Sequence, residues 1–252
     1  AEGWLACGIT GVGRLPEPAA IVEWLEAQLC QTSELEGTTV LVTAGGTQEN
    51  IDPVRYIGNR SSGKMGYAIA EQAVRMGANV ILVSAPTSLS VPRGVEFVPV
   101  DSALSMQEAV ESRYKNVDVV VMAAAVSDFR VLHKAEQKIK KMESMTLELV
   151  KNPDILQGLG SHKEHQILVG FAAETEHVIK YGQDKVARKN LDMLVANDVS
   201  KSNAGFNVDT NEGYFLYPDK EPKEMPNMKK SDLARHILRE VIDLVANRAD
   251  IN

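Results

Sequence analysis

Residues 40–77 constrain the fold of this chain more than any other segment. A buried strand pattern ends there in two glycines, and a helical pattern begins only after a long polar loop. In an ordinary dinucleotide-binding fold the glycine-rich turn leads almost directly into the helix, whose N-terminus holds the pyrophosphate. The loop here carries polar groups to the place where such folds bind ligands. We therefore expect an active-site loop whose substrate-binding residues are Gly45, Gly46, Arg55, Asn59, Ser61 and Ser62.

The same loop has a plainer interpretation as a long connection whose following helix is capped by Ser62, since serine is favoured at helix N-caps. A glycine pair alone is weak evidence for a ligand site. Arg55 also has two interpretations, because it could bind a substrate phosphate or form a structural ion pair with Asp52. The residues alone leave these two roles of Arg55 open.

Apolar runs of strand length alternate with helical patterns along the chain, which predicts an α/β fold. We expect a Rossmann-like, doubly wound and mostly parallel sheet, followed by a C-terminal hairpin and helix. The predicted strands look buried on both faces, as in parallel sheets, and span residues 39–43, 80–84, 95–100, 119–123, 167–171 and 193–196. The hairpin is predicted at 213–217 and 224–228, and the closing helix at 230–246.

Three predicted helices carry apolar stripes that would face the sheet. Their members are Met65, Ile69, Ala73 and Val74 in the first, Met106, Ala109 and Val110 in the second, and Val178, Tyr181 and Val186 in the third.

Composition narrows the class of protein. The chain has 252 residues, of which 44% are hydrophobic, and its 27 basic and 34 acidic residues give a net charge of −7. This balance argues against a general nucleic-acid partner, which needs clustered positive charge. The longest apolar run, 119–126, is far shorter than the roughly 18 residues that span a bilayer. With no visible signal peptide and only Cys7 and Cys30, we expect a reducing, cytoplasmic location.

A second chemical feature is VMAAAVSDF at 121–129, a predicted buried strand that ends in small residues and is followed by Asp128. Small side chains let a ligand approach the backbone, and a carboxylate just past the strand can bind a ribose hydroxyl or hold Mg²⁺. The plainer interpretation is a strand end whose turn is capped by Asp128. The spacing alone does not decide between the two.

Two basic clusters could clamp the phosphates of a nucleotide. The first is KIKKM at 138–142, although alternating lysines also suit a solvated edge strand. The second is Lys185 and Lys189, whose i, i+4 spacing places them on one face of a predicted helix.

Over residues 35–249 the chain resembles the phosphopantothenoylcysteine synthetase family, an enzyme of coenzyme A biosynthesis that is often the C-terminal half of a bacterial bifunctional protein. The matching segments occur in family order: AGGT, DPVRYIxNxSSGKMG, AAAVSDF, KIKK, KNPDIL, GFAAET, KxxxKNLD and ANDVS. The resemblance implies a two-step ligation with Mg²⁺. The carboxylate of 4'-phosphopantothenate attacks the α-phosphorus of CTP, and the amine of L-cysteine then displaces CMP from the acyl-cytidylate. Eukaryotic relatives use ATP.

The resemblance also implies site roles. Lys138 matches the family's catalytic lysine, and Asn59 is the second expected catalytic residue, because its amide can donate a hydrogen bond to the oxyanion of the second step. Asp128 is the expected metal ligand. The expected nucleotide-binding residues are Met122, Ala123, Ala124, Asp128, Lys138, Pro153, Asp154, Ile155, Leu156, Phe171, Lys185 and Lys189. The family is dimeric, so we expect a homodimer.

The domain organisation follows from the same resemblance. Residues 1–34 resemble the end of a flavin-dependent decarboxylase domain followed by a linker, and residues 35–252 form the predicted ligase domain. The flavin-binding core of that decarboxylase domain is missing, so we expect no flavin in this chain and an idle Cys7. The full-length protein would carry the decarboxylase domain.

Two other functions fit parts of the pattern. An NAD(P)-dependent oxidoreductase would share the sheet but needs G-x-G-x-x-G and an acid after the second strand, where Ser84, Ala85 and Pro86 stand instead. A nonenzymatic nucleotide-binding module would leave Asn59 and Lys138 without a role.

Overall fold

The computed structural model describes residues 31–174, 176–198 and 210–249, and before them residues 2–4, 10–12, 15, 17, 18 and 21. Strands β1 (Glu2–Trp4) and β2 (Thr10–Val12) pair antiparallel near the N-terminus. Cys7, Cys30 and most of the segment predicted to be a decarboxylase remnant lie outside the described residues. The predicted division of the chain near residue 35 stays a prediction.

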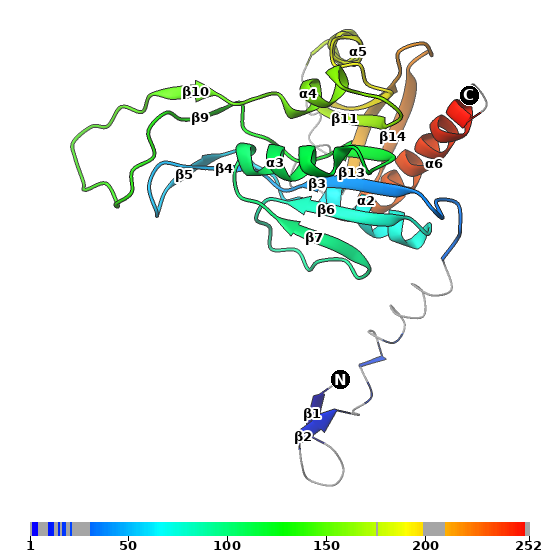
Figure 1. Ribbon diagram of the computed structural model, residues 1–252, viewed down its shortest axis with the longest axis horizontal. Helices are drawn as coiled ribbons and strands as arrows, with labels where there is room; N and C mark the ends of the chain where they lie inside the picture. Colours follow the sequence, from blue (N-terminus) through cyan, green and yellow to red (C-terminus); the bar gives the residue numbers. More distant parts are fainter. Residues whose placement is uncertain are drawn as a thin grey trace.

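One sheet of eight strands forms the centre of the molecule (Figure 1). Its order is β14-β13-β12-β11-β8-β3-β6-β7, and the six strands from β12 to β7 run parallel. Their bounds are β3 (Thr39–Ala44), β6 (Asn79–Ser84), β7 (Val95–Pro99), β8 (Val119–Met122), β11 (Ile167–Glu174) and β12 (Met193–Asp198). The antiparallel hairpin of β13 (Thr210–Leu216) and β14 (Lys223–Lys229) extends the sheet beyond β12. The predicted fold class is confirmed.

The strand order creates a topological switch point. From β3 the chain moves outward to β6 and β7, then returns to β8 on the other side of β3 and continues to β11 and β12. This is the doubly wound arrangement, in which ligands bind in the crevice outside the carboxyl ends of the strands where the order reverses. The crevice therefore lies where the chain leaves β3 and β8.

Helices cover both faces of the sheet. Helices α2 (Lys64–Arg75) and α6 (Lys230–Ala249) pack on one face, and α3 (Ala103–Tyr114), α4 (Ile155–Ser161) and α5 (Val178–Arg188) pack on the other. Alternate residues of a strand point to opposite faces, so Val40 and Val42 join the core under α2 while Leu41 joins the core under α3. No helix of the described part of the chain is both long and apolar enough to cross a membrane.

Two details of the predicted core are wrong. Strand β7 is not buried on both faces, since Glu96 and Phe97 are exposed, because β7 is the outermost strand of the sheet. Tyr181 does not belong to the apolar stripe of α5, because it is 45% exposed while Val186 is buried.

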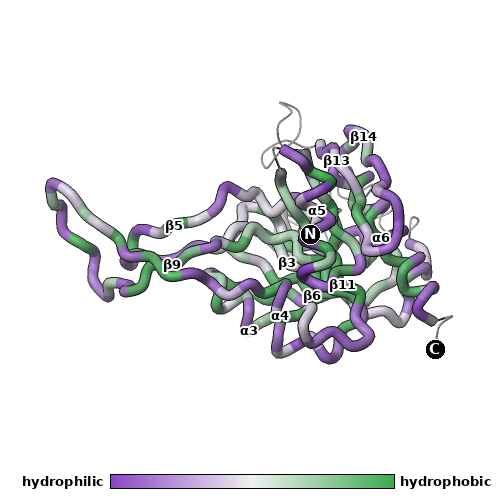
Figure 2. The backbone as a smooth tube through the Cα atoms, turned by 90° about the horizontal axis from the view of Figure 1, so that it is seen from above, coloured by the Kyte–Doolittle hydropathy of each residue, from purple (hydrophilic) through white to green (hydrophobic). Residues whose placement is uncertain are grey.

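Two antiparallel hairpins project together from the carboxyl edge of the sheet (Figures 1 and 2). The first pairs β4 (Gln48–Asn50) with β5 (Tyr56–Gly58), and the second pairs β9 (Phe129–Val131) with β10 (Leu149–Lys151). Strand β4 contacts β9, and the Ala135 amide donates to the Ile51 carbonyl at 2.9 Å. We call residues 48–58 and 129–151 the arm.

Candidate functional site

The backbone at the switch point is built around two glycines. Gly46 forms a parallel bridge with Ala125, whose amide donates to the Gly45 carbonyl at 2.8 Å. Gly45 has a φ of +79°, and a Cβ on Gly46 would lie 2.7 Å from the Asn59 carbonyl oxygen. A side chain at either position would therefore be strained or would clash with the returning loop. The glycine pair brings the chain leaving β3 against the chain leaving β8.

The loop 59–63 closes over this turn. The Nδ2 amide of Asn59 donates to the Val126 carbonyl at 3.1 Å, which ties the loop to the segment after β8. Helix α2 begins at Lys64, and its N-cap is Gly63 with a φ of 75° and no side-chain cap bond. The plainer interpretation, in which Ser62 caps the helix, is therefore wrong, since Ser62 lies one residue before the N-cap.

A cavity of about 380 Å³, which we call the switch-point cavity, opens at this edge. Eight of the predicted site residues line it: Asn59, Ser61, Ser62, Ala123, Ala124, Asp128, Phe171 and Lys185. They come from the active-site loop, the end of β8, β11 and α5, so the fold gathers segments that are far apart in the sequence.

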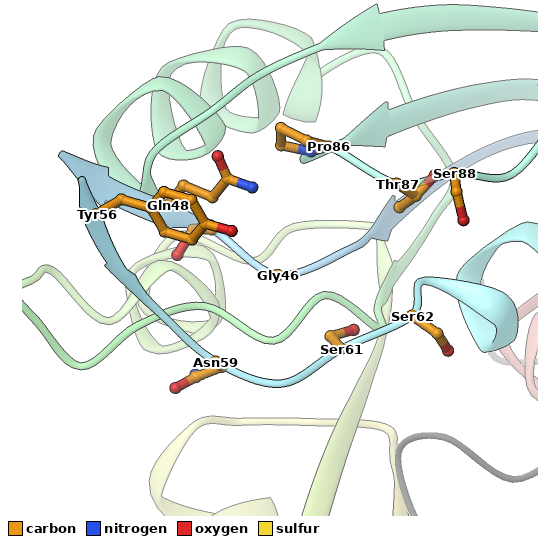
Figure 3. A pocket seen from close by; sticks show the side chains of 10 residues that line it. Gly46, Gln48, Tyr56, Asn59, Ser61, Ser62, Pro86, Thr87 and Ser88 are labelled. Carbon is orange, nitrogen blue, oxygen red and sulfur yellow. The ribbon is translucent and has the colours of Figure 1, made fainter. Parts of the chain in front are cut away.

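A second cavity of about 350 Å³, which we call the loop cavity, borders the same loop. It is lined by Gly46, Thr47, Gln48, Tyr56, Asn59, Ser61, Ser62, Pro86, Thr87 and Ser88. Figure 3 shows residues 59–62 on one side of Gly46 and residues 86–88 on the other. The side chains of this lining carry hydroxyl and amide groups without a fixed charge. Asn59, Ser61 and Ser62 border both cavities.

The described lining of the switch-point cavity has more basic than acidic side chains. Within its described lining, Lys64, Lys185 and Lys230 supply three cationic side chains and Asp128 the single carboxylate. Asp128 is exposed at the carboxyl edge of the sheet. One carboxylate beside phosphate oxygens is the usual protein contribution to a Mg²⁺ site. The described residues contain no group of three or more His, Cys, Asp or Glu placed to hold a metal. Asp128 is the one carboxylate in the described lining that could contribute to holding Mg²⁺.

Several predicted nucleotide-binding residues are not in the described lining of either cavity: Met122, Pro153, Asp154, Ile155, Leu156 and Lys189. The carboxylate of Asp154 accepts from the Gln157 amide at 3.0 Å and so caps α4. Lys189 Nζ lies 2.8 Å from Asp154 Oδ2. Burial raises the pKa of Asp154. The hydrogen bonds from Lys189 and the Gln157 amide, together with the Lys189 charge, outweigh burial and bring the pKa below its ordinary value. Ile155 and Leu156 belong to the core, and their predicted contact with nucleotide stays a prediction.

Arg55 and Lys138 both lie on the arm. Arg55 Nη1 lies 2.6 Å from Asp52 Oδ2, so the structural ion pair, one of its two open roles, is present. Burial raises the pKa of Asp52, but hydrogen bonds from the Val54, Ile139 and Arg55 amides and from the Arg55 side chain lower it below its ordinary value. Lys138 is exposed and lies outside the described linings of both cavities.

Besides Lys64 at the start of α2, three polar residues of the switch-point cavity were not predicted from the sequence: Asn197, Asn211 and Lys230. Asn197 is near the end of β12, and Asn211 opens β13, which runs back beside it. Lys230 follows β14, whose carboxyl end returns to the same edge. Asn211 and Lys230 are buried, and the Oδ1 atom of Asn197 is a buried acceptor without a protein partner in the described structure. The predicted C-terminal hairpin was the sequence signal that could have found Asn211 and Lys230, because its pairing with β12 brings them to the carboxyl edge of the parallel strands.

The strand order and the lysine-bearing cavity at the switch point define a Rossmann-like α/β protein with a candidate ligand site at the carboxyl edge of its sheet. The chain belongs to the family of the DNA/pantothenate metabolism flavoprotein C-terminal domain, whose model matches residues 35–245.

Relatives agree with this assignment. The chain is 50% identical over 247 residues to the coenzyme A biosynthesis bifunctional protein CoaBC of Bacillus subtilis (strain 168), a match that covers 96% of this chain and 61% of that protein. The chain thus spans less than two thirds of that relative.

Solved structures show the same fold. A crystal structure of the C-terminal domain of CoaBC is 44% identical to this chain, with a TM-score of 0.74. The match covers 86% of this chain and 100% of that domain. A Cab2 variant in complex with phosphopantothenate-cysteine shares the fold at a TM-score of 0.65 and 18% identity, with 93% of this chain and 97% of that chain covered.

Proposed function

We propose that this chain is the ligase part of a coenzyme A biosynthesis enzyme and joins 4'-phosphopantothenate to L-cysteine with CTP. The products are 4'-phosphopantothenoylcysteine, CMP and pyrophosphate. Membership of the family, and 50% identity to a bifunctional protein named for coenzyme A biosynthesis, support the proposal. The fold shared with a protein that holds phosphopantothenate-cysteine supports the identity of the product.

One observation carries the proposal most directly. Residues that the family resemblance selects from four motifs, represented by Asn59, Asp128, Phe171 and Lys185, line one cavity at the switch point. Three lysines in that lining suit the negative charge of a nucleoside triphosphate. A carboxylic acid placed beside the α-phosphorus would meet the geometric requirement for nucleophilic attack.

In the proposed first step, a carboxylate oxygen of 4'-phosphopantothenate attacks the α-phosphorus, and the bond from phosphorus to the pyrophosphate oxygen breaks. Negative charge spreads over the phosphoryl oxygens, so nearby cations stabilise the transition state more than the ground state. Lys185 lines the cavity, and Lys138 is proposed to add its charge from the arm. Mg²⁺ held by Asp128 and the phosphates would supply further neutralising charge.

In the proposed second step, the amine of cysteine attacks the acyl carbon, the carbon–oxygen bond to CMP breaks, and the nitrogen loses a proton. The oxyanion that forms needs a donor held in place. Asn59 fits this role, because one N–H of its Nδ2 is held by the Val126 carbonyl, its second N–H can donate to the oxyanion, and the residue borders both cavities. An α-amine ordinarily titrates near about pH 8, so part of the cysteine is neutral at pH 7.

The proposal includes CTP as the nucleotide, a homodimer, a decarboxylase domain in the full-length protein, and a cytoplasmic location. The choice of CTP rests on the bacterial branch that the motifs resemble. The homodimer is supported by the arm, where large apolar side chains are exposed: Val54, Tyr56, Phe129, Leu132, Met142, Met145 and Leu149. Such a surface is typical of one that a partner covers.

The test is a pyrophosphate-release assay with Mg²⁺ and 4'-phosphopantothenate. CTP should support release without cysteine up to about one equivalent per site, and cysteine should convert this burst into continuous turnover. ATP in place of CTP should give a much lower rate. Release that does not depend on 4'-phosphopantothenate would contradict the ligation. Oxidation of NADH or NADPH by the protein would instead favour the oxidoreductase that shares the sheet topology.

A further inference from the structure

Asp52 is a fully buried carboxylate in the turn between β4 and β5 of the arm, with a side chain 0% exposed. Its Oδ1 accepts from the amides of Val54 at 2.8 Å and Arg55 at 2.9 Å. Its Oδ2 accepts from Arg55 Nη1 at 2.6 Å and from the Ile139 amide at 3.1 Å. A buried charge is costly unless it is paired and hydrogen-bonded. These four bonds meet that condition, and the fourth joins the loop 51–55 to a segment 87 residues away.

Ile139 is held at both of its backbone polar groups. Its amide donates to Asp52 Oδ2, and its carbonyl accepts from Arg55 Nη1 at 3.2 Å. The Asp52–Arg55 ion pair therefore grips one residue of the distant segment from two directions. The Ala135 amide adds a third bond, to the Ile51 carbonyl at 2.9 Å.

The gripped residue lies between two lysines of the KIKK motif. Residues 132–148 contain no helix or strand, so no regular ladder fixes the backbone at this point. Ile139 is half-buried, whereas Lys138 and Lys140 on either side are exposed. Holding the backbone of Ile139 therefore constrains the direction in which the side chains of Lys138 and Lys140 leave the chain.

We propose that Asp52 is a positioning residue that acts through Lys138: with Arg55 it grips Ile139 and so directs the lysine used in the first step. This inference rests on the proposed function, which gives Lys138 its role. The Asp52–Arg55 ion pair then has a role in placing Lys138 as well as in stabilising the loop 51–55. Asp52 itself does not touch the reacting atoms.

The first experiment needs no activity. Trypsin cleaves after Lys138, Lys140 and Lys141 in the gripped segment, and after exposed Lys220 between β13 and β14 as an internal reference. Asp52→Asn places an amide donor against the donors of Ile139 and Arg55, so cleavage in the segment should accelerate at least fivefold relative to Lys220. Glu49→Gln is the matched control, because Glu49 is also a buried acid of the arm but accepts from the Ala103 amide. It should leave the segment's cleavage unchanged.

The second experiment is a double-mutant cycle on pyrophosphate release. In the parent, Asp52→Asn should slow release at least tenfold with little change in the KM for CTP. In the Lys138→Gln background the same substitution should change the remaining rate by less than twofold, because the group it positions is already gone. An equal loss in both backgrounds would overturn the proposal, and so would unchanged cleavage of the segment in Asp52→Asn.

The proposal can still be tested if the Asp52 variant fails to fold or if the parent shows no activity. If Asp52→Asn fails to fold, Ile139→Pro removes the gripped amide donor while Asp52 and Arg55 stay in place, and its cleavage after Lys140 and Lys141 should rise while release falls. Parent-like cleavage and release in that variant would overturn the grip. If the parent itself releases no pyrophosphate, the proposed function fails, whereas the cleavage experiment still decides whether the grip exists.

Discussion

Asn59 and Lys138 have different surroundings, although the proposal gives each a role in the same reaction. Asn59 borders both cavities and is anchored to the Val126 carbonyl at 3.1 Å. Lys138 is exposed on the arm, and its neighbour Ile139 is held by Asp52 and Arg55. A donor for the second step is thus placed at the cavity, while the cation for the first step is delivered by a separate element.

Lys138→Gln should nearly abolish pyrophosphate release and leave the fold intact. Removing one charge that stabilises the transition state should cost about 2.7 kcal/mol or more, which is roughly a hundredfold in rate. Thermal unfolding should match the parent, since an exposed lysine contributes little to stability. Stopped-flow detection of pyrophosphate measures the rate, and a value near that of the parent would remove Lys138 from the first step.

Asn59→Asp should still release some pyrophosphate but turn over poorly to 4'-phosphopantothenoylcysteine, so that the acyl-cytidylate accumulates. The carboxylate replaces a hydrogen-bond donor by an acceptor and repels the oxyanion of the second step. Rapid quench with mass spectrometry should find the intermediate in this variant and not in Lys138→Gln. If both variants stop before pyrophosphate release, Asn59 serves binding or loop structure instead.

At the residue scale, the sequence predicted several residues of the switch-point cavity that lie within a few residues of the end of a parallel strand, such as Ala123 and Asp128 after β8. It did not predict Asn211 and Lys230, because they belong to the antiparallel hairpin and reach the ligand edge only through its pairing with β12. The role of Arg55 was also open, since the sequence does not show that Asp52 is buried beside it.

Helix α2 shows how element packing supports the site. A Cβ on Gly66 would lie 2.7 Å from the Ala44 Cβ and 2.8 Å from the Thr43 carbonyl oxygen, so α2 can approach β3 only with glycine at this position. The close approach holds the start of α2 beside the glycine turn that follows β3.

Gly66→Ala should lower the free energy of unfolding by about 1–3 kcal/mol through overpacking against β3. The matched control is Gly158→Ala in α4, where a new Cβ has nothing within 4 Å. It should raise the free energy of unfolding by about 0.5–1 kcal/mol, because alanine is the better helix former. Urea unfolding of the two variants measures both changes, and a loss of equal size in both would refute the packing argument.

At the element scale, the sequence predicted the long periodic strands and helices, but it did not predict the short strands of the arm. The apolar runs of β3, β6 and β8 and the stripe of α2 are local signals that can be read from one window of sequence. Strands β4, β5, β9 and β10 are three residues each, and the bonds that hold the loop 51–55 to residues 135–139 join distant segments. No local pattern contains that information.

At the scale of the whole molecule, the arm projects away from the body (Figure 2), and it carries large apolar side chains that are exposed. Leu149→Glu, which puts a charge on this surface, should convert the proposed homodimer to a monomer without unfolding it. Phe97→Glu is the control, because Phe97 is similarly exposed but lies on β7 at the edge of the sheet, and it should leave the dimer intact. Sedimentation velocity measures both, and a parent that sediments as a monomer would contradict the homodimer.

The central claim is that the carboxylate of 4'-phosphopantothenate becomes bonded to the α-phosphorus of CTP before cysteine attacks. Substrate labelled with ¹⁸O in its carboxylate tests this directly, because the attacking oxygen stays on phosphorus when the carbon–oxygen bond breaks in the second step. After turnover with CTP, Mg²⁺ and cysteine, mass spectrometry should find one ¹⁸O in CMP and none in pyrophosphate. CMP without the label, or label in pyrophosphate, would contradict the account.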